Sequence, residues 1–226
     1  MKTLTKKIKI TGKLKCLSGI RVGGNREAAD IGGIDNPVIR CVLKDRQPYI
    51  PGSSIKGKIR SLLQQAVGEE NEIQKEGSKI CELFGASNNT QEKLDGRMSR
   101  LIVRDAYLTE DSGTRLKDSD FTDMPFTEAK MENRIDRITG KSDQGVRTQE
   151  RVPAGAEFEV HFVINVFKDE DEEGFKNILK AGISMLNDDY LGGSGSRGYG
   201  HVKLDIDWEQ GLTEKNVSEY KIPGNS

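Results

Sequence analysis

The clearest strand in the sequence reads Phe158-Glu159-Val160-His161-Phe162-Val163-Ile164-Asn165-Val166. Apolar side chains fall on its even-numbered residues, and this period of two is typical of a strand with one buried face. After an acidic cluster at 169–173, whose charges suit the positive end of a helix dipole, apolar residues recur at helical spacing from Phe175 to Leu186. Alternation returns over residues 202–208. This part of the chain therefore predicts a strand, a helix and a final strand.

The N-terminal part has the same order of elements. Residues 6–16 alternate between an apolar and a basic face, which predicts a half-buried strand. Pro51-Gly52-Ser53-Ser54 offers turn and N-cap chemistry, and the spacing that follows predicts a helix over about 53–67. A shorter helix around Ile80 to Phe84 should stop at Gly85, and residues 101–107 suggest a second strand. The full order, β-α-β-β-α-β, predicts an α+β fold with a ferredoxin-like (RRM-like) core.

Two stretches do not fit this core. Residues 18–50 are too long for a simple crossover, and residues 109–152 are polar, with Gly140 and Gly145 near a hairpin tip. Long insertions in a compact domain are usually functional or disordered. We therefore expect residues 1–226 to form a single domain that carries two inserted segments.

The composition indicates a globular protein, because 34% of the residues are hydrophobic and 31% are charged. The basic N-terminus is not followed by an apolar stretch, so no secretory signal is expected. The longest apolar run, Phe162 to Phe167, is too short to cross a membrane. Three cysteines without a Cys-x-x-Cys spacing favour a reducing compartment. These features predict a cytoplasmic protein that does not bind membranes.

Charge is distributed unevenly along the chain. The formal net charge is −1, yet residues 1–60 contain fourteen Lys or Arg and four acidic residues, a local net charge of +10. Such asymmetry can create a positive face that follows a phosphate backbone. Ordinary surface lysines on one strand face explain the charge equally well.

A glycine-rich run, Gly192-Gly193-Ser194-Gly195-Ser196-Arg197-Gly198-Tyr199-Gly200, lies between the second helix and the last strand. Glycines allow close backbone approach, and successive N–H groups can form an anion-binding nest with Ser194, Ser196 and Arg197 as further donors. The run lacks the Gly-Lys-Ser/Thr ending of a Walker motif and follows a helix instead of opening one, unlike the Rossmann fingerprint. We favour phosphate contact over the alternative, a flexible turn.

A second basic motif covers residues 51–60. Lys56 and Arg60 are four residues apart and therefore share one helical face near a helix N-terminus, where free N–H groups favour anions. Because cations at a helix start oppose the dipole, an anionic partner would relieve a conflict. Solvated lysines are the alternative.

Asp35 lies in the basic, glycine-rich segment that ends in Gly32-Gly33-Ile34-Asp35-Asn36-Pro37. A lone loop carboxylate is most often a turn-former, so chemistry on a phosphodiester is the minority interpretation from the residues alone. With only two histidines, His161 and His201, and no paired cysteines, neither a zinc site nor a two-histidine ribonuclease mechanism is expected.

Several segments together resemble a known family. The Gly-Gly pair followed by Ile34-Asp35-Asn36-Pro37-Val38-Ile39, and then residues 50–58, is similar to the repeat-associated (RAMP) proteins of CRISPR systems. Residues 98–106, 132–139 and 189–198 narrow the resemblance to the backbone subunit of type III-A (Csm) interference complexes. The matching segments span most of the chain in the right order.

The resemblance implies a subunit that polymerises along CRISPR guide RNA and cleaves complementary target RNA at regular intervals. The implied partners are the guide RNA, the target RNA, further copies of the chain, the large polymerase-like subunit, the small helical subunit and other RAMP subunits. The insertion at 126–151 would form a hairpin "thumb" that wedges into the guide–target duplex. The implied RNA-binding residues are Arg21, Gly23, Gly24, Ser53, Ser54, Lys56, Lys58, Arg60, Arg134, Arg137, Gly193, Ser194, Gly195, Ser196 and Arg197.

The resemblance also implies that Asp35 is the catalytic residue and acts with a divalent metal ion, Mg²⁺, whose ligands it does not identify. Some relatives carry histidine where this chain has Arg21, which preserves RNA contact and removes any proton transfer there. Three other functions stay open: a purely structural RNA-binding subunit, a guide-processing endoribonuclease, and an unrelated ferredoxin-like metabolic enzyme. The positions that match residues supporting catalysis are Asp105, Glu128, Glu132 and Glu150.

Overall fold

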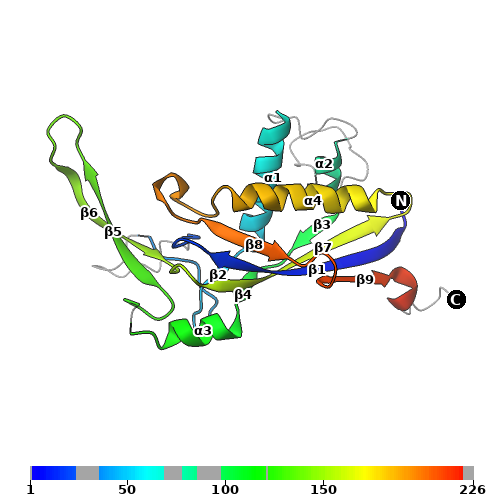
Figure 1. Ribbon diagram of the computed structural model, residues 1–226, viewed down its shortest axis with the longest axis horizontal. Coiled ribbons are helices and arrows are strands. Elements are labelled where there is room, and N and C mark those ends of the chain that lie inside the picture. Colours follow the sequence, from blue (N-terminus) through cyan, green and yellow to red (C-terminus); the bar gives the residue numbers. More distant parts are fainter. Residues whose placement is uncertain (1, 24–35, 69–77, 86–97, 121, 221–226) are drawn as a thin grey trace.

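The computed structural model describes residues 2–23, 36–68, 78–85, 98–120 and 122–220 (Figure 1). Its strands are β1 (Leu4–Cys16), β2 (Tyr49–Ile50), β3 (Leu101–Val103), β4 (Ala106–Leu108), β5 (Glu128–Ile135), β6 (Ser142–Arg151), β7 (Glu157–Phe167), β8 (Val202–Ile206) and β9 (Leu212–Asn216). Its helices are α1 (Gly52–Val67), α2 (Lys79–Phe84), α3 (Glu110–Lys117) and α4 (Glu172–Asn187), with 3-10 turns at Gly195–Arg197 and Val217–Tyr220.

The main sheet has the order β2-β4-β7-β1-β8, with β3 beside β7 and β9 beside β1. β1 lies between β7 and β8 and is antiparallel to both. β3 and β4 pair antiparallel with the other edge of β7. With α1 following β1 and α4 following β7, this is the split βαβ arrangement. The predicted ferredoxin-like fold is confirmed.

The helices α1, α2 and α4 cover one face of this sheet, and α3 lies on the other side (Figure 1). The even-numbered apolar residues of β1 from Ile8 onward and those of β7, such as Ile10 and Phe162, are buried beneath α1 and α4. α1 and α4 approach closely at Gly182, where a Cβ atom would lie within 3 Å of the Ile59 side chain. The strand alternation and the helical spacing thus point the same residues into one core.

The strand predicted over 101–107 is instead two short strands. β3 pairs with residues 162–164 of β7, and β4 pairs with residues 158–159. The strand is therefore interrupted at Arg104-Asp105. The break serves the start of α1, because Asp105 Oδ1 accepts a hydrogen bond of 2.8 Å from the Gly52 N–H. The N-cap residue is Pro51 and no side chain of its own turn caps the helix. The helix thus begins in the predicted segment, but its first N–H group is capped by a carboxylate from the break and not by a side chain of Pro51-Gly52-Ser53-Ser54.

Besides the two-residue strand β2, which lies in the inserted stretch 18–50, two described elements were not expected. α3 lies inside the polar insertion, where Thr109 caps it by accepting a bond from the Ser112 N–H. β9 extends the sheet along β1 after a turn at 207–211, and the last predicted strand ends at Ile206 instead of Trp208. Both elements are largely polar and exposed, so they lack the apolar periodicity that reveals the others.

No helix in the described ranges is long and apolar enough to cross a membrane.

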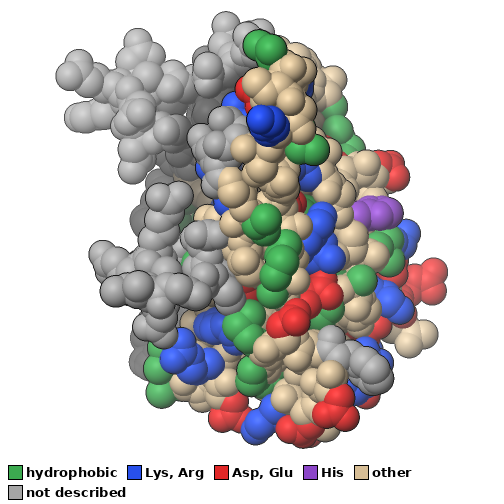
Figure 2. Space-filling view, turned by 90° about the vertical axis from the view of Figure 1, so that its left-hand side faces the viewer, with side chains coloured by type: hydrophobic (Ala, Val, Ile, Leu, Met, Phe, Trp, Pro, Cys, Tyr) green, Lys and Arg blue, Asp and Glu red, His purple; other side chains and the backbone are tan. Residues whose placement is uncertain are grey.

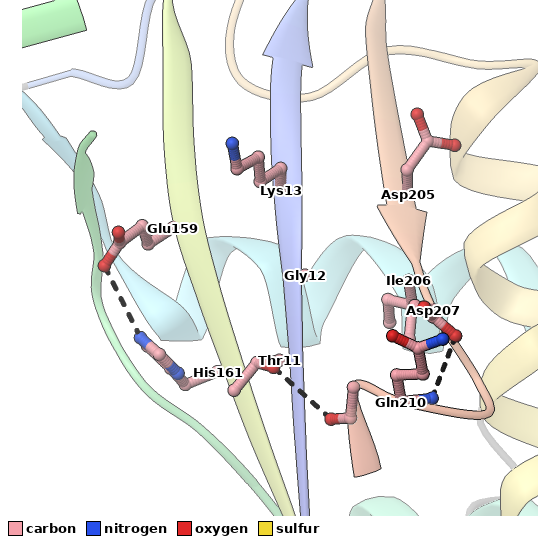
Figure 3. A pocket seen from close by; sticks show the side chains of 10 residues that line it. Thr11, Gly12, Lys13, Glu159, His161, Asp205, Ile206, Asp207 and Gln210 are labelled. Atoms are coloured by element: carbon pink, nitrogen blue, oxygen red, sulfur yellow. Dashed lines mark hydrogen bonds and ion pairs between the residues drawn. The ribbon is translucent and has the colours of Figure 1, made fainter. Parts of the chain in front are cut away.

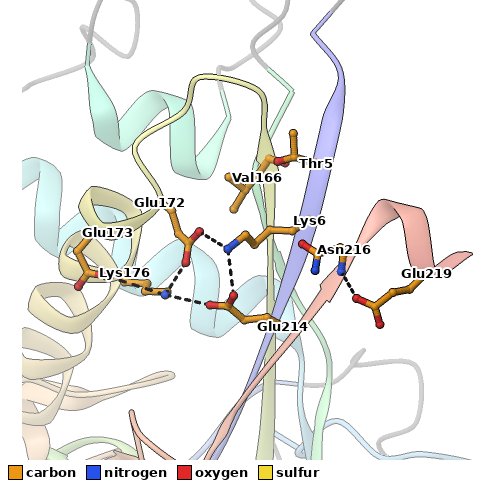
Figure 4. A network of polar contacts seen from close by, with 9 residues as sticks. All are labelled: Thr5, Lys6, Val166, Glu172, Glu173, Lys176, Glu214, Asn216 and Glu219. Atoms are coloured by element: carbon orange, nitrogen blue, oxygen red, sulfur yellow. Dashed lines mark hydrogen bonds and ion pairs between the residues drawn. The ribbon is translucent and has the colours of Figure 1, made fainter.

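An ionic network holds β9 against the core (Figure 4). Lys6 Nζ on β1 lies 2.8 Å from Glu172 and 3.0 Å from Glu214 of β9, and Lys176 Nζ contacts the same two carboxylates. The hydrogen bonds to Glu172 and Glu214 raise the pKa of Lys6. Burial alone would raise the pKa of Glu172, but hydrogen bonds from Lys176 and Lys6 outweigh it, so this pKa is lowered.

We expect Lys6→Met to lower the free energy of unfolding by less than about 1 kcal/mol, because the network is partly exposed. A carboxylate with a lowered folded pKa contributes stability above its unfolded pKa of about 4.3 and loses it as the pH falls through the folded value. The difference between variant and wild type should therefore shrink below about pH 4 and in 1 M salt. Urea titrations measure it, with Lys9→Met on the same strand as the control. An unchanged difference in high salt would contradict an ionic origin.

Candidate nucleic-acid interface

The glycine-rich run between α4 and β8 is held in one conformation by backbone hydrogen bonds. The Gly193 N–H donates to Arg21 O at 2.9 Å, and the Gly200 N–H donates to Gly19 O at 3.0 Å. The Leu191 N–H donates to Gly200 O at 2.8 Å, and this hydrogen bond joins the two ends of the run. The run therefore rests on the segment that follows β1, and it is not a free turn.

Glycine is required at particular positions of this run. Gly192 has a φ of +87°, and a Cβ atom there would lie 2.3 Å from Arg21 O. At Gly195 a Cβ atom would collide with the Tyr190 ring, and at Gly200, with a φ of +69°, it would collide with Leu191 O. Gly198 also has a positive φ, +82°, but open space lies where its Cβ atom would be. The backbone is thus packed tightly on its inner side and free on its outer side.

The outer side of the run presents hydrogen-bond donors to solvent. Ser196, Arg197 and Gly198 are exposed. Arg197 Nη2 donates to Ser194 Oγ at 2.7 Å, which orients the guanidinium over the loop. Exposed hydroxyl and guanidinium groups on a fixed loop are donors that phosphate oxygens accept from. The backbone N–H groups of Arg197 and Gly198 are not among them, because they donate to Ser194 O and Gly195 O within the loop.

The basic face of α1 meets this loop through Lys58. Lys58 Nζ lies 3.2 Å from Asp189 Oδ1 and 3.8 Å from the centre of the Tyr190 ring. Tyr190 in turn packs its ring on Gly195, so the lysine supports the loop and keeps its charge beside it.

Lys56 has a different environment. Its ammonium group donates to Ser99 Oγ at 2.5 Å and to Leu101 O at 2.8 Å, and burial together with the Arg60 charge lowers its pKa. Arg60 has one buried nitrogen, Nη2, without a hydrogen-bond acceptor in the described part of the chain. Sequence spacing placed Lys56 and Arg60 on one face, but Lys58 is the lysine that lies beside the glycine-rich run.

The β5–β6 hairpin is rooted on the same loop. The Tyr199 side chain is buried between Lys130 Nζ, 4.5 Å from the ring centre, and the Arg151 guanidinium, 5.1 Å from it. Arg151 also lies on Gly19, and its Nε is 2.5 Å from Glu128 Oε1. Burial first, and then the neighbouring Glu132 carboxylate, raises the pKa of Tyr199 to about 12. The hairpin root and the glycine-rich run therefore form one packed unit.

The outer part of the hairpin exposes apolar side chains. The exposed fractions are 73% for Met131, 61% for Ile135, 94% for Ile138 and 60% for Val146. Figure 2 faces the hairpin and shows hydrophobic side chains along it, with Lys and Arg side chains beside them. Arg134 and Arg137, predicted to bind RNA, are both exposed here. A protruding hairpin with apolar and cationic side chains suits stacking on bases and pairing with phosphates.

The segment that follows Asp35 is anchored at the hairpin root. Asn36 forms a parallel bridge with Gln149, and the Val38 N–H donates to Glu150 Oε2 at 2.7 Å. On its other side, the Ile39 N–H donates to Val22 O at 3.0 Å. Asp35 itself, like Gly24, lies outside the described residues. The structure thus connects the described end of this segment to both the hairpin and the glycine-rich run.

The four carboxylates predicted to support catalysis are engaged in contacts within the protein. Asp105 caps α1 and Glu128 pairs with Arg151. Glu132 lies 3.9 Å from Arg197 Nε and 3.8 Å from Lys130 Nζ, and Glu150 is buried. Within the described residues, no group of three or more His, Cys, Asp or Glu side chains is arranged to hold a metal ion.

A hollow of 740 Å³ lies on the sheet face that α1 and α4 leave uncovered (Figure 3). Its charged lining comprises three carboxylates, Glu159, Asp205 and Asp207, with Lys13 and His161. Excess negative charge disfavours phosphates, so the lining of this hollow gives no support for an RNA contact there. His161, with its Nε2 4.0 Å from Glu159, is a partly exposed strand residue.

Comparison with known proteins identifies the family. The profile of the RAMP superfamily matches residues 13–203. The chain belongs to the RAMP superfamily. It is 40% identical over 213 residues to the "CRISPR system Cms endoribonuclease Csm3" of Methanocaldococcus jannaschii, covering 89% of this chain and 80% of that protein. The Csm3 proteins of Enterococcus italicus, at 40% identity (89% and 91% covered), and Mycobacterium tuberculosis, at 37% (90% and 89% covered), are similarly close, so the chain belongs with them.

A chain of one solved structure shares the fold. The "Type III-B Cmr-beta bound to cognate target RNA" contains a chain that matches with a TM-score of 0.61 at 15% sequence identity. The match covers 90% of this chain and 60% of that longer one. At this identity the likeness concerns the fold, and it agrees with the ferredoxin-like topology.

Some residues of this RAMP interface were not predicted from the sequence. Tyr199, Lys130 and Arg151 join the hairpin to the glycine-rich run, and Arg40 pairs with Glu150. Tyr199 is the one aromatic residue inside the glycine-rich run, which was a visible signal. Arg40 and Arg151 carry no such signal in the sequence. Their partners, Glu150 and Glu128, are distant in the sequence and become neighbours only through the fold.

Proposed function

We propose that this chain is the guide-RNA-binding backbone subunit of a type III-A interference complex in a prokaryotic cytoplasm, and that it cleaves complementary target RNA at regular intervals. The observation that carries the proposal is the connection of three parts in one packed unit. These parts are the glycine-rich run, the hairpin, and the segment that follows Asp35. The endoribonuclease names of the Csm3 relatives support the activity.

The glycine-rich run would hold the guide backbone. Its exposed donors face outward while its inner side is fixed by Arg21, and Lys58 adds positive charge beside it. A protein that follows an RNA backbone without reading sequence needs such phosphate contacts. Repetition of the same contact by successive copies would produce a filament on one guide, beside the large polymerase-like, small helical and other RAMP subunits of the complex.

The hairpin would distort the guide–target duplex. In an A-form helix the 2′-OH is not aligned with the leaving 5′-oxygen, so cleavage requires a local change of geometry. Inserted apolar side chains unstack bases at a cost of a few kcal/mol per step. The exposed Met131, Ile135 and Ile138 are suited to this role.

Asp35 would then act on the distorted linkage. Its carboxylate takes the proton of the 2′-OH, the 2′-oxygen bonds to the adjacent phosphorus, and the bond to the 5′-oxygen breaks as that oxygen takes a proton from water. The products are a 2′,3′-cyclic phosphate and a 5′-hydroxyl. Mg²⁺ is proposed as cofactor, and it would stabilise the charge that develops on the phosphate. No described residue is assigned to it, because the described carboxylates at the interface already have protein partners.

The proposal is tested by reconstitution of the complex with and without this chain. The complex that contains the chain should retain guide RNA through purification and cut a complementary target. A target with a single 2′-deoxynucleotide at one cut position should lose that cut alone. Guide binding without any cutting would favour the purely structural alternative, and cutting of precursor guide by the isolated chain would favour the processing enzyme.

We expect Ile138→Asp at the exposed hairpin to slow target cleavage by about fivefold and to leave guide affinity unchanged, because a charged side chain inserts poorly between bases. Leu43→Asp is the matched control, since both side chains are 94% exposed and Leu43 lies outside the hairpin. Single-turnover cleavage and filter binding measure the two quantities. Equal effects of the two substitutions would contradict a wedge role for the hairpin.

A further inference from the structure

We propose that Glu150 is a positioning residue, which fixes the loop carrying Asp35 relative to the hairpin so that the cut falls at one linkage. This inference rests on the proposed function and concerns how the segment that follows Asp35 is aligned with the hairpin. Glu150 is not proposed to touch the RNA.

Glu150 is buried and its oxygens are occupied. Its side chain is 3% exposed. Oε2 accepts the Val38 N–H at 2.7 Å, and Oε1 accepts from Arg40 Nη2 at 2.5 Å and from Thr127 Oγ1 at 2.8 Å. A buried carboxylate whose two oxygens accept three hydrogen bonds from the protein is a poor base and a poor metal ligand, since either role needs an oxygen that the substrate or the ion can reach.

The three donors come from the two parts that must be aligned. Val38 and Arg40 belong to the segment that follows Asp35, whereas Thr127 directly precedes β5 and Glu150 itself lies on β6. The backbone adds to the joint, because the Glu150 N–H donates to Asn36 O at 3.3 Å. Asn36 is the residue directly after Asp35 in the sequence. Glu150 therefore fixes residues 36–40 against the hairpin root.

Arg40 completes the joint. Its Nη1 donates to Arg46 O at 2.8 Å and to Pro125 O at 3.4 Å, and its Nη2 donates to Thr127 Oγ1 at 2.9 Å as well as to Glu150. One guanidinium thus spans the turn before β2 and the start of the hairpin. Buried ion pairs add little net stability compared with apolar packing, and some act by selecting one arrangement of the chain. The contact between the segment that follows Asp35 and the hairpin is a place where a single arrangement would determine which linkage is cut.

The same contacts continue to the glycine-rich run. The segment after Asp35 bonds to Val22 through the Ile39 N–H, and Arg21 O accepts the Gly193 N–H. A continuous set of hydrogen bonds therefore runs from the predicted guide contact, through the joint, to the hairpin. If Glu150 is altered, we expect the glycine-rich run and the hairpin each to keep its own structure, while their relative orientation is no longer fixed.

The test compares Glu150→Gln with wild type in the reconstituted complex. Glutamine keeps the shape but removes the charge that pairs with Arg40. We expect guide affinity within about twofold of wild type, cleavage at saturating target about tenfold slower, and products spread onto linkages next to the main cut, because a small misplacement of reacting groups is costly. The double variant Glu150→Gln/Arg40→Met should be no slower than the slower single variant, since the two side chains act as one unit.

The controls separate positioning from folding. Asp45→Asn removes an exposed ion pair between the same turn and Lys117 of α3, and should leave the rate and the cut positions unchanged. If Glu150→Gln does not fold, Thr127→Val removes one of the three bonds and should shift the products in the same direction by a smaller amount. Loss of guide binding in proportion to the loss of cleavage would overturn the proposal, because a merely structural residue predicts that result.

The outcome also distinguishes this inference from the proposed function. If Asp35→Ala cleaves like wild type, the catalytic assignment fails. If Asp35→Ala is inactive while Glu150→Gln, folded and guide-bound, cuts the same linkages at the wild-type rate, the positioning role alone is wrong.

Discussion

Replacement of Asp35 by alanine in the reconstituted complex should lower the rate of target RNA cleavage by about 1000-fold, which lies within the range that general acid–base groups contribute. Guide and target affinities should stay within about twofold, because the predicted phosphate contacts lie on the glycine-rich run and α1. The physical reason is the loss of the only group proposed to take the 2′-OH proton. Single-turnover rates at saturating target isolate this step from binding.

Asp45→Ala is the matched control for this experiment. It removes a carboxylate from the same inserted segment, and that carboxylate is 67% exposed and pairs only with Lys117 among the residues that the structure describes. The control should cleave at the wild-type rate. A similar loss in both variants would show that any carboxylate removed from this segment has the effect, and would contradict a specific role for Asp35.

The second large effect is expected at Gly192. A Cβ atom there would lie 2.3 Å from Arg21 O on a backbone with φ of +87°, so Gly192→Ala must displace the loop from the Arg21 segment. We expect guide affinity to fall by about 30-fold or more, since an alanine at positive φ and a backbone clash together cost at least 2 kcal/mol. Filter binding with labelled guide measures it directly.

Gly198→Ala provides the comparison. Gly198 has a similar φ of +82° in the same run, but nothing lies within 4 Å of its would-be Cβ atom. An alanine at position 198 would have the backbone strain of a positive φ but no steric clash, so guide affinity should fall by about threefold at most. Equal losses in the two variants would mean that the bracing of the run by Arg21 has no part in guide binding.

The core elements could be predicted because their signals are local. Alternation in β1 and β7, and helical spacing in α1 and α4, each report burial within a short window. The break between β3 and β4 was not predictable, because its cause is the contact of Asp105 with Gly52, fifty-three residues away. α3 and β9 were missed because few of their residues are buried, so their sequences carry little apolar pattern.

The site was predictable to a different degree in its different parts. The glycine-rich run was visible as a local motif, whereas Lys58, which the structure places beside it, was implied only by the family resemblance. The contacts of Lys56 could not be predicted, since its ammonium group donates to Ser99 and Leu101, more than forty residues away in the sequence. The joint between Glu150 and Arg40 links residues 110 positions apart, so no spacing rule could reveal it. The role of Asp35 rests on family resemblance and stays a prediction.

Product mapping on an end-labelled target, cut by the reconstituted complex, tests the central claim most directly. We predict a ladder of regularly spaced cuts in Mg²⁺, no ladder in chelator, and no ladder when every copy of the chain carries Asp35→Ala. Each product that carries a 5′ label should end in a 2′,3′-cyclic phosphate. An unchanged ladder from the Asp35→Ala complex would contradict the account, because the cutting group would then belong to another residue or another subunit.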